Sequence, residues 1–227
     1  MVIPQLDERM TVSNPILQDE MFEWAKDLFP ICRSITGEGV RETLSYLKNI
    51  LPKMSIHEVP TGTRAFDWTV PEEWNIEDAY IIDPNGKKIV DFKKNNLHVI
   101  GYSEPVDKIL ELGELKQNLY SDPNRPESIP YITSYYQKRW GFCLAHSQLE
   151  GLEEGKYEVV IRSSFKQGSL TYGELLIPGK SDKEIFLSTY ICHPSMANNE
   201  ISGPVVTAAI GRTIMEDVSR RYSYRII

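Results

Sequence analysis

His193, Asn199 and Glu200 are the residues of this chain whose types and spacing could do chemistry. Zinc in proteins prefers imidazole and carboxylate ligands, and a catalytic zinc keeps one coordination position for water. A histidine followed six and seven residues later by an amide and a carboxylate could therefore give one ion a nitrogen and an oxygen. A lone histidine beside a polar loop is more often a hydrogen-bonding group, so the spacing alone leaves both interpretations open.

The elements that must position these residues are a strand before them and a helix after them. Residues 184–191 carry almost no charge, which is typical of a strand buried on both faces. Pro194 cannot continue a central ladder, and after the polar loop an apolar stripe recurs every four residues, which predicts a helix that buries Val206, Ile210, Ile214 and Val218. In open α/β sheets ligands bind beyond the carboxyl ends of the strands, which is where this loop would lie.

Cys192 stands directly before His193 and raises the alternative of a thiol nucleophile. Adjacent residues on a strand point to opposite faces. If the strand continues through this pair, the two side chains cannot act together. We therefore expect no cysteine–histidine catalytic pair here.

Two helices are expected near the start of the chain, over residues 19–28 and 38–51, with a glycine-containing loop between them. Arg33 lies in that loop between apolar neighbours. It is either a buried structural ion-pair partner or a clamp for a substrate carboxylate. The sequence leaves both roles open.

The middle of the chain has a different character, being rich in aromatic residues, prolines and short strand-like runs. Pro84-Asn85-Gly86 predicts a hairpin turn, and residues 106–120 are the one stretch here with helical spacing. We therefore expect an α/β domain made of residues 1–60 and 163–227, with residues 61–162 inserted as a β-rich lid domain. We call residues 61–162 the insert.

Composition narrows the classes of protein and of partner. The chain has 227 residues, with 41% hydrophobic and 25% charged residues, as in soluble globular proteins. The formal net charge of −7, without a basic stripe, argues against nucleic acid or an anionic membrane as partner. The first ten residues lack a basic and apolar leader, and three widely spaced cysteines fit free thiols, so a cytoplasmic location is expected.

Three motifs carry a resemblance to a known family. They are the segments TYICHPSMANNEISG (189–203), PICRSITG (30–37) and YITSYY to WGFC (131–143). Together they resemble a bacterial family of aminopeptidase-like proteins, often encoded beside polysaccharide biosynthesis genes, and the likeness extends over nearly the whole chain. The resemblance implies an α/β fold, the doubly wound sheet of the two-zinc aminopeptidases, of which this chain holds the N-terminal portion, with an inserted β-rich lid domain.

Carried over position by position, the resemblance implies that His193 is a zinc ligand. Asn199 falls where the aminopeptidase pattern has the aspartate that bridges two metals, and Ser195 falls where it often has the aspartate that orients the histidine. A neutral amide cannot bridge two cations as a carboxylate does, so a two-zinc site would be weakened unless Glu200 substitutes for it. The resemblance also implies that the general-base glutamate and the remaining ligands lie beyond Ile227, so we expect this chain alone to bind zinc weakly or not at all and to be inactive.

The sequence therefore predicts a zinc-dependent, aminopeptidase-like hydrolase of a peptide or amide bond in a small substrate, with one or two zinc ions in the complete protein. His193, Asn199 and Glu200 are the expected metal ligands, and Arg33, Tyr135 and Tyr136 are the expected substrate-binding residues. The alternative is an inactive aminopeptidase-like module that binds a sugar or a peptide. The sequence leaves open whether identical chains assemble into an oligomer.

Overall fold

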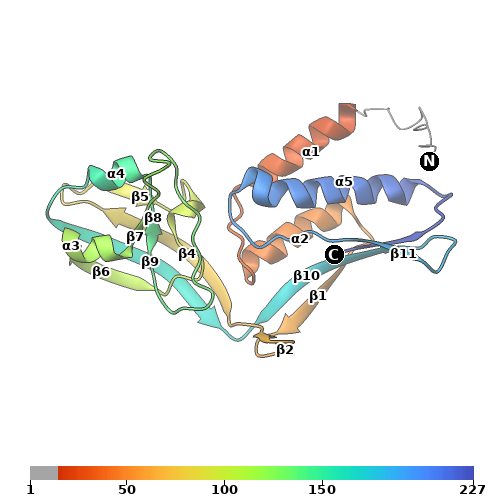
Figure 1. Cartoon of the computed structure of the whole chain (residues 1–227), viewed down its shortest axis with the longest axis horizontal. Coiled ribbons are helices and arrows are strands. Elements are labelled where there is room, and N and C mark those ends of the chain that lie inside the picture. Colours follow the sequence, from red (N-terminus) through yellow and green to blue (C-terminus); the bar gives the residue numbers. More distant parts are fainter. Residues whose placement is uncertain (1–14) are drawn as a thin grey trace, which may run out of the picture.

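The computed structural model describes residues 15–227 and contains two sheets of four strands, each with its own apolar core (Figure 1). The first sheet is mixed and has the strand order β1-β10-β12-β11. Its strands β1, β10 and β12 are antiparallel neighbours, and β11 runs parallel to β12. The elements of this part are α1 (Pro15–Leu28), α2 (Glu38–Ile50), β1 (Ser55–Pro60), β10 (Ser169–Ile177), β11 (Glu184–Leu187), η4 (Ala197–Ile201), α5 (Ser202–Glu216) and β12 (Ser223–Ile226).

The core of this first part lies between its helices and one face of its sheet. Leu44 and Leu47 of α2 pack in one cluster with Leu175 of β10 and Val205 of α5. In Figure 1, α1, α2 and α5 all lie on the same side of the sheet. Elements far apart in the sequence therefore share one core, because α2 and α5 each have one apolar side to bury.

The second sheet is antiparallel and has the order β5-β4-β9-β6. A separate cluster that includes Ala79, Val159 and Ile161 forms its core. We propose that the two clusters mark two units, the α/β unit and the insert, as the sequence predicts. The elements of the second part are β2 (Arg64–Ala65), β3 (Trp68–Thr69), β4 (Glu73–Ile82), β5 (Lys88–Asp91), η2 (Asn96–His98), β6 (Val106–Glu111), α3 (Leu112–Leu115), η3 (Lys116–Asn118), β7 (Leu119–Tyr120), β8 (Phe142–Cys143), α4 (His146–Glu150) and β9 (Lys156–Lys166).

Two crossings join the parts. The first leads from β1 through the short hairpin β2–β3 to β4, and the second consists of Gln167 and Gly168 between β9 and β10. The hairpin β4–β5 turns at residues 83–87, as Pro84-Asn85-Gly86 predicts. The expected helix over 106–120 is wrong for most of its length, because residues 106–111 form β6 against β9 and only residues 112–118 are helical turns.

The expectation of a strand buried on both faces at residues 184–191 is wrong. β11 ends at Leu187, and the side chains of Ile185 and Phe186 are exposed at 37% and 59%. The reason is its position: β11 is an edge strand of its sheet in the described residues, and the helices lie on one side only (Figure 1). No helix within residues 15–227 is both long and apolar enough to cross a membrane.

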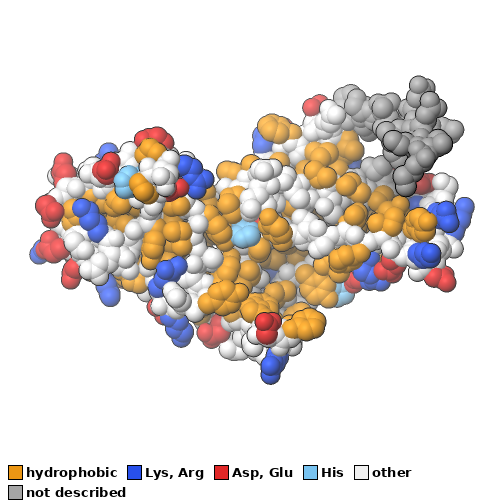
Figure 2. Space-filling view, viewed as in Figure 1, with side chains coloured by type: hydrophobic (Ala, Val, Ile, Leu, Met, Phe, Trp, Pro, Cys, Tyr) orange, Lys and Arg blue, Asp and Glu red, His pale blue; other side chains and the backbone are white. Residues whose placement is uncertain are grey.

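The apolar stripe expected on the last helix is also wrong. Val206, Ile210 and Val218 are exposed, and α5 buries Val205, Ala208 and Ala209 instead. Small side chains allow α5 to lie close to the sheet and to α2, whereas Val206 and Ile210 face outward. Ile214 of the expected stripe packs against the core, and Val218 lies beyond the end of α5. Hydrophobic side chains are accordingly visible over the α1 and α5 side of the surface in Figure 2. Phe22 of α1 and Phe29, which directly follows α1, are exposed as well.

Candidate functional site

His193 lies just beyond the carboxyl end of β11, in the loop that leads to η4. The same end of the sheet holds the end of β12, since the backbone nitrogen of Thr189 donates to the carbonyl oxygen of Ile227 at 2.9 Å. Because β11 and β12 are parallel, their carboxyl ends open to the same side. The sheet thus places this histidine where α/β proteins commonly bind ligands.

Glu200 is the direct partner of His193. Nδ1 of the imidazole lies 2.9 Å from Oε2 of the carboxylate. Glu200 belongs to the π-helical turn η4, which points its side chain inward, so that the residue is only 1% exposed. With the proton on Nδ1, the histidine donates to Glu200 and keeps the lone pair of Nε2 free for a metal ion.

Arg33 lies on the other side of the same carboxylate. Its Nε is 3.6 Å from Oε1 of Glu200, and both side chains are fully buried. Nε also donates to the carbonyl oxygen of His193 at 3.1 Å, and Nη1 donates to the carbonyl oxygen of Leu28 at 2.7 Å. Of the two roles that the sequence left open for Arg33, these contacts describe the internal ion pair. The role of Arg33 toward a substrate stays a prediction.

Burial and the neighbouring charges have opposite effects on the pKa values of Glu200 and Arg33. Burial raises the pKa of the Glu200 carboxyl, while hydrogen bonds from His193 and the positive charge of Arg33 limit that rise. Burial likewise lowers the pKa of the Arg33 guanidinium, and the charge of Glu200 counters it. Oε1 of Glu200 and Nη2 of Arg33 have no hydrogen-bond partner among the described residues. Oε1 therefore faces the guanidinium of Arg33 as an ion pair without a hydrogen bond.

The thiol of Cys192 lies closer to the histidine than the sequence predicts. Sγ is 3.6 Å from Nδ1 of His193, because β11 ends before this pair and the alternation of strand side chains does not apply. The argument that separated the two residues is therefore wrong. Burial nevertheless raises the pKa of Cys192 to about 11, which keeps the thiol protonated near neutral pH and disfavours a nucleophilic thiolate.

The fit of this group to zinc follows from its donors. Ligand-type atoms of Cys192, His193 and Glu200 all lie within 4.8 Å of one another. Imidazole, carboxylate and thiolate are the three donor types that zinc binds. Because Oε2 of Glu200 is already hydrogen-bonded to Nδ1, the carboxylate lies where it can orient the histidine, in the way that carboxylates commonly support metal-binding imidazoles.

Asn199 and Ser195 differ from Glu200 in that neither is hydrogen-bonded to the ring of His193. Asn199 is exposed, and its backbone carbonyl accepts a hydrogen bond from the hydroxyl of Tyr190 at 2.7 Å. Ser195 is buried and donates to the carbonyl oxygen of Phe29 at 2.9 Å. The carboxylate that is hydrogen-bonded to His193 thus belongs to Glu200 of η4, and position 195 does not supply it. The role of Asn199 as a ligand stays a prediction.

Two tyrosines that the sequence analysis did not select pack against His193. The rings of Tyr131 and Tyr190 meet that of His193 edge to face, with centroids 4.9 Å and 5.4 Å away. Tyr131 belongs to the insert, so the site is built from both parts of the chain. The only sequence signal for it is its place in the segment 131–136, which the family motif already includes.

Of the two tyrosines that the sequence selected, one connects to this group. The hydroxyl of Tyr135 lies 3.0 Å from that of Tyr131. Tyr136 packs on the ring of Tyr135 at 6.4 Å and is 83% exposed. The structure therefore links His193, Tyr131 and Tyr135 in a row that ends at Tyr136 on the surface.

Comparison with known proteins identifies the family. Residues 22–227 match the family described as "Domain of unknown function (DUF4910)". The chain belongs to this family. A relative from Clostridium acetobutylicum is 49% identical over 208 residues, which are 92% of this chain and 48% of that protein. It carries the provisional name of a polysaccharide biosynthesis protein with an aminopeptidase-like domain.

Solved structures agree on the fold of this DUF4910 chain. A crystal structure from Clostridium acetobutylicum, provisionally titled a peptidase, has a TM-score of 0.89 at 47% identity and covers 94% of this chain and 51% of its own. The zinc aminopeptidase of Bacillus subtilis has a TM-score of 0.59 at 11% identity, over 92% of this chain and 59% of its own, which shows the fold alone. The chain thus has an α/β, aminopeptidase-like fold, and it spans about half the length of its Clostridium relatives.

Proposed function

We propose that this chain is part of a zinc-dependent hydrolase that cleaves a peptide or amide bond in a small substrate. The observation that carries the proposal is the hydrogen bond of His193 to the buried Glu200, beyond the carboxyl end of β11. The fold, which the zinc aminopeptidase of Bacillus subtilis shares, supports it. A zinc ion there would supply a Lewis acid for the carbonyl oxygen and lower the pKa of water toward 7.

Each residue of the site has a defined role in this proposal. His193 offers Nε2 to the ion, and Glu200 holds the imidazole in one orientation and tautomer. Arg33 offsets the charge of Glu200 and so limits the rise of its pKa that burial causes. Tyr131 and Tyr190 enclose the imidazole and limit the access of bulk water. Asn199 and the residues Tyr135 and Tyr136 are proposed to face the second metal position and the substrate, respectively.

The second candidate function is a binding module without turnover. The neutral Asn199, where the aminopeptidase pattern has an aspartate, and the exposed ring of Tyr136 favour it. Aromatic rings on a surface bind sugar or peptide groups by contact area alone. In this case no metal chemistry would be needed.

Metal content separates the two proposals. The purified full-length protein is loaded with zinc, dialysed and analysed for bound metal, and its His193→Ala variant is treated in parallel. The hydrolase proposal expects zinc to be retained by the wild type and lost from the variant, and hydrolysis of some member of a panel of aminoacyl amides by the metal-loaded, full-length protein. Zinc retention that does not depend on His193 contradicts the proposal.

The three free thiols support the further proposal of a cytoplasmic location.

A further inference from the structure

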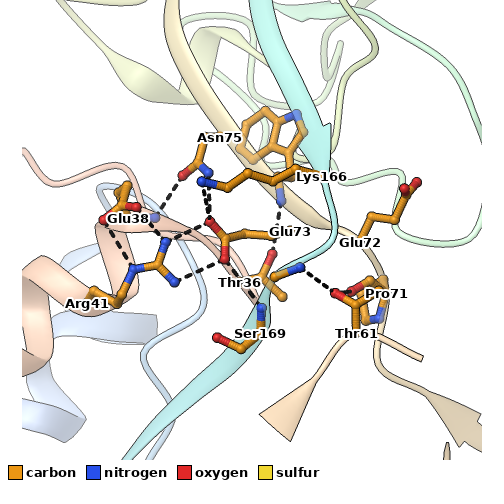
Figure 3. Close-up of polar contacts among 12 residues, drawn as sticks. Thr36, Glu38, Arg41, Thr61, Pro71, Glu72, Glu73, Asn75, Lys166 and Ser169 are labelled. Atoms are coloured by element: carbon orange, nitrogen blue, oxygen red, sulfur yellow. Dashed lines mark hydrogen bonds and ion pairs between the residues drawn. The ribbon is translucent and has the colours of Figure 1, made fainter. Parts of the chain in front are cut away.

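Glu73 lies at the joint between the insert and the α/β unit. It is the first residue of β4, and it is 2% exposed. Both oxygens of its carboxylate accept from Arg41 of α2, Oε2 from Nη1 at 3.0 Å and Oε1 from Nη2 at 2.6 Å. This two-pronged geometry is the strongest form of an arginine–carboxylate pair. An element of the α/β unit thus holds the first strand of the insert sheet by one buried charge (Figure 3).

The same carboxylate also holds the second crossing. Nζ of Lys166, the last residue of β9, lies 3.3 Å from Oε1 of Glu73. The backbone nitrogen of Ser169, the first residue of β10, donates to Oε2 at 3.3 Å. Glu73 therefore contacts residues on both sides of Gln167 and Gly168, which link β9 of the second sheet to β10 of the first. Figure 3 shows these partners converging on the carboxylate from different elements.

Two glycines lie so close to Glu73 and Trp74 that a side chain at either position would clash. A Cβ atom added to Gly168 would meet Oε2 of Glu73 at 2.3 Å and its Cβ at 2.7 Å. A Cβ atom added to Gly37 would meet the carbonyl oxygen of Trp74 at 2.3 Å, and its φ of 101° also favours glycine. Gly168 of the second crossing and Gly37 before α2 thus pack against Glu73 and its neighbour Trp74 without room for a side chain.

Further hydrogen bonds near Glu73 also join segments on the two sides of the joint. The backbone nitrogen of Trp74 donates to Oγ1 of Thr36 at 3.1 Å, and Oγ1 of Thr36 lies 2.6 Å from the hydroxyl of Tyr102. Thr61 joins the two crossings, since its backbone nitrogen donates to the carbonyl oxygen of Gly168 at 2.9 Å. These bonds are neutral, and among the described residues of the joint Glu73 carries the buried charge.

The orientation of the insert matters for the site because Tyr131 reaches His193 from the insert. We propose that Glu73 is a positioning residue: its ion pair with Arg41, and the hydrogen bond that it accepts from the backbone of Ser169, fix the insert on the α/β unit and thereby hold the ring of Tyr131 against His193. The inference concerns the docking of the two parts and does not depend on the proposed hydrolysis. Loss of the charge leaves both cores folded but lets the insert turn at its crossings.

The Glu73→Gln variant tests this, because it keeps the size of the side chain and removes its charge. The first measurement is acylation of histidines by diethyl pyrocarbonate in metal-free protein, followed by peptide mass spectrometry. His193 should be modified several-fold faster than in the wild type, relative to His57 in the α/β unit and His146 in the insert. The second is amide hydrogen exchange, which should rise at Trp74, whose partner lies across the joint, and stay unchanged in the middle of β4.

Glu38→Gln is the matched control, since Glu38 is an exposed second partner of the same arginine. It should change neither readout. Arg41→Gln should move both readouts in the direction of Glu73→Gln, and because the side chain of Arg41 is 25% exposed, this variant decides the question if Glu73→Gln does not fold. The proposal is overturned if the folded variants keep the wild-type rate at His193 and the wild-type exchange at Trp74.

Discussion

Nδ1 of His193 lies 2.9 Å from Oε2 of Glu200, and Oε1 of the same glutamate lies 3.6 Å from Nε of Arg33. The glutamate is thus shared between an imidazole on the surface of a loop and a buried guanidinium. A carboxylate in this place orients the histidine and neutralises the arginine at once. Both effects can be measured by substitution.

Substitution of Glu200 by glutamine should weaken zinc binding without abolishing it. If the carboxylate only orients the histidine, its loss should lower the affinity about 10- to 100-fold, as removal of such supporting partners commonly does. Calorimetric zinc titration of the folded variant measures this. A complete loss of binding, equal to that of His193→Ala, would instead make Glu200 a direct ligand.

Asn199→Asp tests whether the position that resembles the bridging aspartate still faces a metal. In the full-length protein a carboxylate there should tighten zinc binding, because it adds a negative charge and a second oxygen ligand. Asn198→Asp is the control, since it makes the same change at the adjacent exposed residue. Equal zinc titrations for the two variants would show that position 199 has no special relation to the ion.

Stability should depend on pH through Glu73. Hydrogen bonds from Arg41, more than any other contact, hold the pKa of this carboxyl at about 2, below its ordinary value of 4.5. A depressed pKa in the folded state means that the stabilisation is complete above pH 4.5 and is lost as the pH falls toward 2. The full loss is about 3 kcal/mol. Urea titrations of wild type and Glu73→Gln between pH 6 and 2.5 should converge, and parallel curves would contradict this account.

The three thiols should differ in reactivity while the protein is folded. Burial raises the pKa of Cys32 and Cys143 to about 12 and that of Cys192 to about 11, so all three should react slowly near pH 8. Cys143, which is fully buried, should be the slowest. Labelling with a thiol reagent should yield three equivalents after unfolding without reductant, since all three cysteines are free. Fewer equivalents would indicate a disulfide.

Adjacent valines on α5 test which face of the helix is buried. Val205 is 4% exposed and Val206 is 44% exposed. Val205→Gln should cost about 2–4 kcal/mol of unfolding free energy, because it places a polar group in the core, whereas Val206→Gln should stay within about 0.5 kcal/mol. Chemical denaturation of both variants compares them directly, and a larger loss for Val206→Gln would favour the stripe that the sequence predicts.

The sequence by itself determined the local order of the elements and the chemical types at the site. Helical periodicity places α2 at Glu38–Ile50 within one residue, and Pro84-Asn85-Gly86 predicts the turn of the hairpin β4–β5. These patterns depend on neighbours a few positions apart, which the sequence displays directly. His193, with the polar run after it, was recognisable for the same reason.

Only the tertiary structure decided which faces and which partners these elements have. Whether β11 is central or at an edge, and whether α5 buries Val205 or Val206, depends on what packs beside them, and no local period records this. The contacts of Glu200 with Arg33 and of Tyr131 with His193 join residues far apart in the chain. They exist because the chain returns from the insert to the α/β unit through the second crossing, where the partners of Glu73 are likewise residues that no sequence pattern names.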